Sequence, residues 1–319
     1  MSEENKQPQD TRKDLDILNK MKNLPGGLVI IPLVIAVVLA TFVPQVFQIG
    51  GYVTALFYEG NACMMGFFLI VCGSMIDIKQ VGMPLYKGVI MTGTKFLLGV
   101  IVGLIVGKIC GPEGFLGIAP FVLIATITNS NGSLYISLSS QFGNATDTGA
   151  ISILSLNDGP FFTLIALGAT GLANIPIKSL IAVLVPLLIG FIWGNLDKGF
   201  RDACKTAQPI VTFFMTISIG AKTDIKTILT AGASGIVLGL ISAATAVIFF
   251  FVINLLLPKK ERNAMGAAIG TTALNSAMTP AAVAEADPSM EGMVSMATAQ
   301  CATASIINPV PLPVHYSSI

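Results

Sequence analysis

Gly73-Ser-Met-Ile-Asp77-Ile-Lys79 and Gly220-Ala-Lys-Thr-Asp224-Ile-Lys226 are two versions of one short segment, and they lie 147 residues apart (220 − 73) in a chain of 319 residues. The same offset aligns Gly88-Val-Ile-Met with Gly235-Ile-Val-Leu. The chain is therefore interpreted as a duplicated unit. Internal duplication of hydrophobic halves is a signature of secondary transporters.

The composition indicates a membrane protein. Hydrophobic residues make up 53% of the chain, charged residues 11%, and the mean hydropathy is +0.79. A soluble core of this size cannot bury so much apolar surface. Residues 1–22 are polar and predict a solvated tail without a cleavable signal peptide. The net charge of +1 favours no nucleic-acid partner, and the five scattered cysteines lack the spacing of a metal site.

Ten apolar segments have about the length of a membrane span, which is roughly 20 helical residues for a bilayer core about 30 Å thick. They lie near 27–43, 53–73, 88–108, 115–141, 148–172, 179–195, 206–221, 228–257, 264–285 and 292–314. Because five spans per repeat is an odd number, the sequence predicts two inverted five-helix repeats, 23–174 and 175–319. Most lysines and arginines fall in loops on the side of the amino terminus, which predicts that both termini are cytoplasmic.

Inverted repeats place the two Asp-Ile-Lys segments on opposite sides of the membrane. This favours a retained structural turn over a shared ligand site. Asp77 and Asp224 are therefore expected to cap or neutralise helix ends, because a carboxylate near exposed backbone N–H groups is stabilising.

Segments four and nine are interrupted by polar residues at bilayer depth. Segment four contains Asn129-Ser130-Asn131-Gly132, and segment nine contains Asn275-Ser276 and Thr279-Pro280; an offset of 146 aligns the two Asn-Ser pairs. These residues favour unwinding and capping, and proline cannot donate to the preceding turn. Broken helices that meet near the midplane present half-helix N-termini, which bind carboxylates. The breaks therefore predict a site for a small anionic or polar solute; the alternative is that these residues only hold helices together.

Charged residues within spans are few, so each is a functional candidate. Asp158 lies about ten residues into segment five, where Gly159-Pro160 loosens the helix. A buried carboxylate there suits proton coupling. Lys95 lies about 12 Å deep, too deep for easy snorkelling, and is expected either to pair with Asp158 or to help neutralise an anionic substrate. Glu59 is a third candidate, with a position at the membrane interface as the alternative.

Several short motifs together resemble the 2-keto-3-deoxygluconate permeases from Leu24 onward. They are Pro25-Gly26-Gly27-Leu28, Thr94-Lys95, Asn131-Gly132-Ser133-Leu134-Tyr135, Gly159-Pro160, Gly168-Ala-Thr-Gly171-Leu-Ala173, Gly190-Phe-Ile-Trp-Gly194-Asn195-Leu-Asp197, and Thr279-Pro280 with Glu285. The resemblance implies a proton-coupled importer of a six-carbon keto-deoxy sugar acid in a bacterial inner membrane. It also implies a fold like that of bile-acid symporters and sodium/proton antiporters, in which segments four and nine cross where they unwind. Among polar positions it supports Lys95, Asn131, Gly132, Tyr135, Thr279, Pro280 and Glu285.

Two positions depart from the expected family pattern. The pattern has an acidic residue where this chain has Asn157, and a small hydroxyl residue where it has Asp158. The carboxylate is therefore displaced by one residue, which rotates it about 100° around the helix. Asn275-Ser276 stands where smaller residues are expected, so a different sugar acid remains an open alternative.

The sequence as a whole predicts an all-α, ten-helix symporter that works by alternating access, with segments one, two, six and seven moving against a core that carries both breaks. The residues expected to bind substrate are Asn129, Ser130, Asn131, Gly132, Ser133, Tyr135, Thr272, Asn275, Ser276 and Thr279. Those expected to couple a proton or cation are Asp158, Asn157, Lys95 and Glu59.

The expected partners are a small sugar-acid anion, a proton and the lipid bilayer. Sodium is the alternative coupling ion, and a homodimer is one open oligomeric state. No cofactor, metal or catalytic residue is expected. A cation/proton antiporter that uses Asp158 is the alternative transporter. A membrane-embedded hydrolase is disfavoured because the spans contain no histidine and no second deep aspartate.

Overall fold

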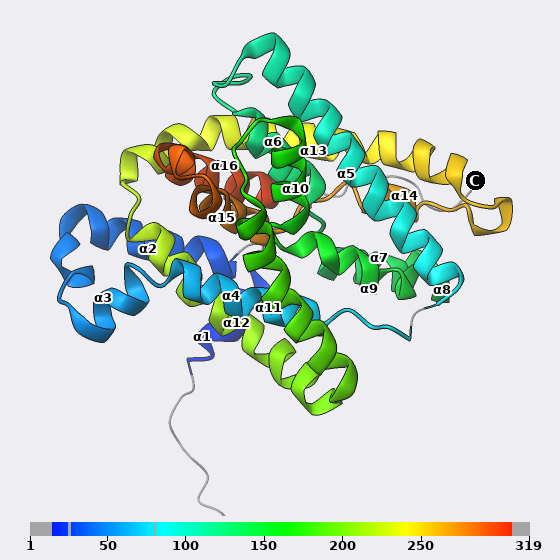
Figure 1. The fold of residues 1–319 in the computed structure, drawn as a ribbon, viewed down its shortest axis with the longest axis horizontal. Coiled ribbons are helices and arrows are strands. Elements are labelled where there is room, and N and C mark those ends of the chain that lie inside the picture. Colours follow the sequence, from blue (N-terminus) through cyan, green and yellow to red (C-terminus); the bar gives the residue numbers. More distant parts are fainter. Residues whose placement is uncertain (1–14, 25–26, 80, 308–319) are drawn as a thin grey trace, which may run out of the picture.

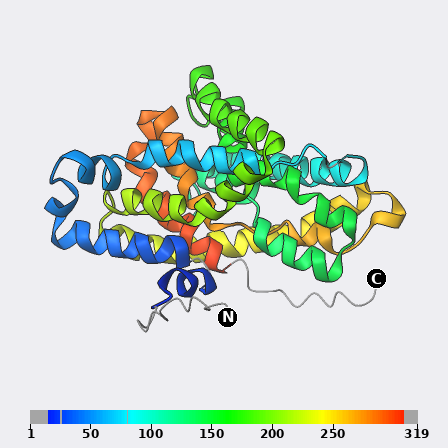
Figure 2. The ribbon, with the colours of Figure 1, turned by 90° about the horizontal axis from the view of Figure 1, so that it is seen from below.

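The computed structural model describes residues 15–24, 27–79 and 81–307, and this part of the chain is helical apart from one isolated bridge between Phe115 and Ile118 (Figure 1). Residues 1–14 of the predicted tail lie outside the described residues. The end of that tail, Ile17–Asn23, forms the short helix α1, which packs against α2 (Gly27–Phe42). Figure 2 shows α1 at the edge of the helical body.

Three helices are long and apolar enough to cross a membrane: α5 (Met83–Cys110), α11 (Ile177–Leu196) and α13 (Ile225–Leu256). Two bent pairs raise the number of candidate spans to five. One pair is α3 (Gly51–Phe57) with α4 (Asn61–Ser74), bent by 56°, and the other is Ala145–Asp158 with α10 (Phe161–Thr170), bent by 58°. The described residues thus form an all-helical membrane protein with three to five candidate spans.

The remaining predicted segments are divided, too short or partly polar, so length and composition do not mark them as spans; α2, for example, is apolar but has 16 residues. Segment seven belongs to α12 (Lys198–Gly220), whose first half is rich in charged residues. The other elements are η1 (Pro44–Phe47), α8 (Ala145–Gly149), α9 (Ile151–Leu154), η2 (Ser155–Asp158), η3 (Lys259–Glu261), η5 (Pro288–Met293) and α16 (Val294–Ile307).

Both predicted interruptions are confirmed. Segment four is divided into α6 (Pro120–Thr128) and α7 (Gly132–Phe142), with residues 129–131 between them. Segment nine is divided into α14 (Met265–Ala268), η4 (Leu274–Met278) and α15 (Thr279–Ala286). The second half of segment four starts at Asn131, whose side-chain oxygen accepts from the Leu134 N–H at 3.0 Å and so satisfies a free donor of the new helix.

The two repeated Asp-Ile-Lys segments differ in what their carboxylates bind. Asp224 caps α13, because its Oδ1 accepts from the Thr227 N–H at 2.8 Å, and this bond holds the pKa of the carboxyl below its usual range. Asp77 instead accepts from the Lys79 N–H at 2.9 Å, and its Oδ2 lies 3.6 Å from Nη1 of Arg201. The predicted cap is thus confirmed for Asp224, whereas Asp77 closes a local turn.

The helices form two groups. One consists of α2, α4, α11 and α12, in which α4 packs on both α11 and α12. The other contains α5, α6, α13 and α16, together with both breaks. In Figure 1, α2, α4 and α12 lie at the lower left and centre, whereas α5, α6 and α13 lie above and to the right. This division coincides with the predicted moving panel and core.

Close backbone approach of α4 and α11 depends on glycine. A Cβ at Gly73 would collide with the carbonyl oxygen of Leu187, and one at Gly190 would collide with that of Ile70. Close packing of helices through small residues is a common membrane interface.

Gly73→Ala is therefore expected to destabilise the protein by about 1–3 kcal/mol, because the backbones of α4 and α11 must separate. The matched control is Gly66→Ala on the same helix, where a Cβ would meet no atom within 4 Å. Thermal unfolding in detergent should show a lower midpoint for Gly73→Ala than for Gly66→Ala. Equal midpoints would contradict the close contact.

Candidate functional site

The two breaks contact each other through Asn129. Its Nδ2 donates to Oδ1 of Asn275 at 2.9 Å and to the carbonyl oxygen of Asn157 at 3.1 Å. Its Oδ1 accepts from the Ala273 N–H at 2.8 Å and from the Thr272 hydroxyl at 3.3 Å. Asn129 and Asn275 are the residues that the sequence offset of 146 pairs. The predicted meeting of the breaks is thus confirmed, and it is made by residues that the sequence offset aligns.

A cavity of about 450 Å³ opens beside this crossing. Its wall includes residues from both breaks, from Ala145–Asp158 and from the α2, α4 and α12 group. The lining includes Phe68, Asn131, Gly132, Ser152, Ser155, Asp158, Lys205, Gln208, Thr212 and Asn275. Asp158 is the one acidic residue in the described lining. Lys205 is exposed and supplies a positive charge at the rim.

The Asp158 carboxylate lies between the two breaks. Asn275 forms a side-chain hydrogen bond with it. Its Oδ2 would lie 3.8 Å from a Cβ at Gly132, so it is close to the first residue of α7. The N-terminus of a helix carries a partial positive charge. Asp158 therefore faces a position that also attracts other anions.

A second cavity, of about 390 Å³, lies along the first half of α4. Asn61, Met65 and Leu69 line this cavity, whereas Phe68, Val71 and Cys72 line the first. Lys178 and Glu285, both exposed, belong to the lining of the second cavity. The helix α4 thus forms part of the wall of both cavities, of which the first contains Asp158.

The family model described as 2-keto-3-deoxygluconate permease matches residues 18–319 of the chain. The chain belongs to this permease family. It is 43% identical over 300 residues to 2-keto-3-deoxygluconate permease 1 of Salmonella typhimurium, and the alignment covers 94% of each chain. It is 30% identical over 298 residues to the 2-keto-3-deoxygluconate permease of Bacillus subtilis, which covers 92% of this chain and 90% of that protein.

The resemblance predicted from the short motifs is confirmed over nearly the whole chain. The protein is therefore a membrane transporter and not an enzyme.

Four of the predicted site residues of the permease line the first cavity: Asn131, Gly132, Asp158 and Asn275. Six others are buried beside the crossing and make no part of the lining: Asn129, Ser130, Asn157, Thr272, Ser276 and Thr279. Ser130 Oγ accepts from Asn157 Nδ2 at 3.4 Å, which links the first break to η2, and Ser276 Oγ donates to the Ala273 carbonyl at 2.7 Å within the second break. Together with the hydrogen bonds of Asn129 and Thr272, these contacts hold the breaks in place in this structure.

The other predicted residues lie elsewhere in the permease. Tyr135 is buried in α7 and donates to the Asp147 carbonyl at 3.0 Å. Glu59 is exposed in the turn between α3 and α4. Lys95 is buried in α5 and donates to main-chain carbonyls of the second break. Ser133 lies in α7, and its side chain is outside the part that the structure describes.

Sequence reasoning missed two serines of the cavity wall and three residues of α12. Ser152 and Ser155 precede Asp158 at intervals of three, which places all three side chains on one helical face. That spacing within an apolar segment was a usable signal. Lys205, Gln208 and Thr212 follow a similar three-to-four spacing on α12, but their position at the cavity depends on how α12 packs.

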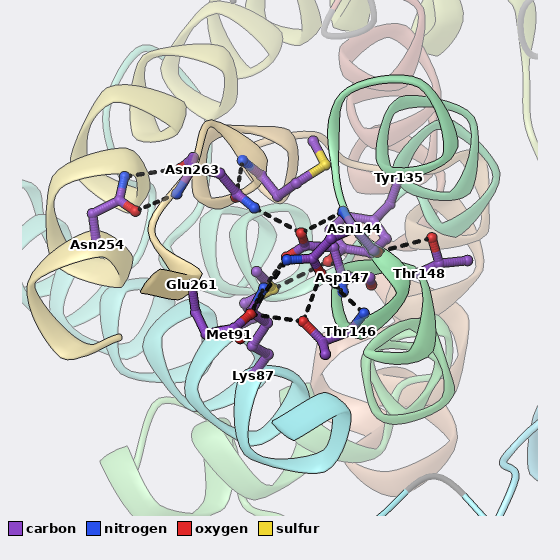
Figure 3. Close-up of polar contacts among 11 residues, drawn as sticks. Lys87, Met91, Tyr135, Asn144, Thr146, Asp147, Thr148, Asn254, Glu261 and Asn263 are labelled. Atoms are coloured by element: carbon purple, nitrogen blue, oxygen red, sulfur yellow. Dashed lines mark hydrogen bonds and ion pairs between the residues drawn. The ribbon is translucent and has the colours of Figure 1, made fainter. Parts of the chain in front are cut away.

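A buried ionic network lies apart from this cavity, at the start of α5 (Figure 3). Lys87 Nζ lies 2.6 Å from Asp147 Oδ1 and 2.9 Å from Glu261 Oε2. Asn263 Nδ2 donates to the other Asp147 oxygen at 2.7 Å. The hydrogen bond from Lys87 holds the pKa of Glu261 below its usual range. The network ties Lys87 and Asp147, in the first half of the chain, to Glu261 and Asn263 in the second half.

The charge pattern counts Lys87 among the lysines in loops on the side of the amino terminus, and this placement is wrong. The side chain is fully buried within α5. Its burial is tolerated because two carboxylates, one of them also fully buried, compensate the ammonium charge.

Lys87→Met is expected to destabilise the permease by about 3–5 kcal/mol, because it leaves the Asp147 carboxylate buried without a cation. The control is Glu261→Gln, which removes the partly exposed partner and should cost about 1 kcal/mol or less. Thermal unfolding of both variants in detergent checks this order. Equal losses would mean that Lys87 contributes no more than an exposed ion pair.

Proposed function

We propose that this permease imports 2-keto-3-deoxygluconate or a closely related sugar acid together with a proton, by alternating access in a bacterial inner membrane. The observation that carries the proposal is one cavity in which Asp158 and the first residue of α7 lie together at the crossing of two broken helices. Family membership and the names of the two relatives support the substrate.

The chemistry of the cavity suits a small hydroxylated carboxylate. A volume of about 450 Å³ is within the usual range for small-molecule sites, about 300–1,000 Å³. The free N–H groups at the start of α7 are suited to the substrate carboxylate. Asn131, Ser152 and Ser155 supply amide and hydroxyl groups for the sugar hydroxyls. Lys205 attracts the anion toward the rim.

Coupling follows from competition between two carboxylates. A charged Asp158 and a substrate anion repel each other when both face the start of α7. A like charge nearby favours the neutral form of a carboxylic acid. Substrate therefore binds best when Asp158 carries a proton, and the two leave together.

The proposed topology is ten spans in two inverted repeats, with both termini cytoplasmic. The order of elements supports it, because an offset of 147 carries α5 (Met83–Cys110) onto residues 230–257, most of α13. The same order follows in each half: a long helix and then a broken segment. In this orientation the Lys205 side of the first cavity faces the cytoplasm. The second cavity, at Lys178 and Glu285, then faces outward.

Alternating access requires the α2, α4, α11 and α12 group to move against the group that carries the breaks. The position of α4 in the walls of both cavities supports this division. Movement of α4 relative to Asp158 would open the site to one side and close it to the other.

The test is uptake of labelled 2-keto-3-deoxygluconate into proteoliposomes under an imposed pH gradient, with and without sodium. We expect accumulation that requires the gradient and does not require sodium. Absence of uptake together with cation-dependent proton flux would instead identify an antiporter of the same fold.

A further inference from the structure

Lys95 lies against the backbone of the second break and makes no part of either cavity wall. Its side chain is 1% exposed. Nζ donates to the carbonyl oxygen of Ile269 and, at 3.2 Å, to that of Thr271. Both carbonyls follow the end of α14, where the chain is unwound. Nζ also lies 5.3 Å from the centre of the Phe249 ring.

Carbonyl oxygens at an unwound helix end carry partial negative charge and bind cations. In secondary transporters with broken helices, such carbonyls coordinate the coupling sodium ion near the midplane. An ammonium group has three donors and no acceptor, so it satisfies the same carbonyls with a charge of the same sign. The aromatic face of Phe249 adds a further favourable contact for a cation.

We propose that the Lys95 ammonium is a built-in cation that occupies, on the second break, the place a sodium ion would take. The side chain comes from α5 of the first repeat, and it thus fixes the unwound chain of the second without a bound metal. This inference deepens the proposed function, on which it rests for the identity of the driving ion. With this position filled, Asp158 remains the acid that responds to the transported proton.

The proposal changes the role expected for Lys95. The sequence suggested direct help with the substrate anion or a pair with Asp158. Asp158 and Lys95 do interact electrostatically, but the hydrogen bonds that Lys95 donates go to the main-chain carbonyls of Ile269 and Thr271. Lys95 therefore acts on transport as a positioning residue, through the shape of the break.

Two variants that remove the same charge distinguish this role from simple packing. Lys95→Ala removes the ammonium and leaves space beside the Ile269 and Thr271 carbonyls. Lys95→Met removes the ammonium but fills most of that space with an apolar chain. Thermal unfolding of each variant in detergent is compared in sodium chloride and in choline chloride at equal ionic strength.

We expect sodium to raise the unfolding midpoint of Lys95→Ala by about 3 °C or more over choline, because an ion that binds only the folded state stabilises it. Lys95→Met and the unchanged protein should show no difference between the two salts. A structural role alone would lower both midpoints without a sodium-specific recovery.

The proposal is overturned if Lys95→Ala folds and its midpoint is the same in both salts, or if sodium specifically stabilises the unchanged protein. If Lys95→Ala does not fold in either salt, the unfolding midpoint of the unchanged protein is still a test. A midpoint that is higher in sodium than in choline would contradict a site already occupied by the Lys95 ammonium. No substrate is used in these measurements. Failure of sugar-acid uptake would therefore overturn the proposed function and leave this result standing.

Discussion

Asp158→Asn is expected to abolish concentrative uptake of the sugar acid. A gradient of one pH unit is worth 1.36 kcal/mol per proton and supports about tenfold accumulation of substrate when one proton is coupled without net charge movement. Asparagine resembles the protonated acid in shape and cannot exchange a proton. The accumulation ratio in proteoliposomes should therefore fall from about 10 to about 1.

The same variant should still exchange substrate. Because the amide does not repel an anion, labelled substrate should equilibrate with unlabelled substrate across the membrane, and this exchange should no longer depend on pH. The control is Glu59→Gln, since Glu59 is the other predicted coupling acid and lies exposed in the turn between α3 and α4. Tenfold accumulation by Asp158→Asn would show that Asp158 does not couple the proton. Loss of accumulation in Glu59→Gln but not in Asp158→Asn would assign coupling to Glu59.

Asn129→Asp is expected to have the largest effect on the folded state at the crossing. The carboxylate keeps the acceptor for the Ala273 N–H but loses both donors, which now serve Asn157 and Asn275. Each buried group left unsatisfied costs about 1–3 kcal/mol, so the free energy of unfolding should fall by about 2–6 kcal/mol. The thermal unfolding midpoint in detergent measures the loss.

The matched control for Asn129→Asp is Asn131→Asp, two residues along the same break. Asn131 caps α7 through its side-chain oxygen, and aspartate is an equally good cap. Its midpoint should therefore stay close to that of the unchanged protein. A midpoint for Asn129→Asp as high as that of Asn131→Asp would show that the donors of Asn129 contribute little.

The features that depend on local chemistry could be predicted from the sequence. Both breaks follow from residues that favour caps over helix, and the structure has them at Asn129–Asn131 and before Thr279. The offset of 146 aligned Asn129 with Asn275, but both were predicted to bind substrate, and the hydrogen bond between them is a finding of the structure. Asp158 was predicted from its charge within an apolar segment, and it lines the cavity.

What depends on distant partners could not be predicted. The burial of Lys87 requires Asp147 and Glu261, which come from other elements. Charge counting alone therefore placed this lysine in a loop. For the same reason the sequence did not separate residues that line the cavity from those that support it. Thr272 and Ser276 carry hydroxyl groups that could bind a sugar acid, but Thr272 donates to Asn129 and Ser276 donates to the Ala273 carbonyl, so both hydrogen bonds lie within the two breaks.

The hydrogen bond between Asn129 and Asn275 shows how two residues aligned by the sequence offset can take different roles. It runs in one direction: Nδ2 of Asn129 donates to Oδ1 of Asn275, and the Asn275 side chain in turn bonds Asp158. The direction of a single hydrogen bond thus distinguishes the two asparagines, one serving the contact between the breaks and the other the acid. A paralogue that reversed this direction would have to place its acid on the opposite half of the chain.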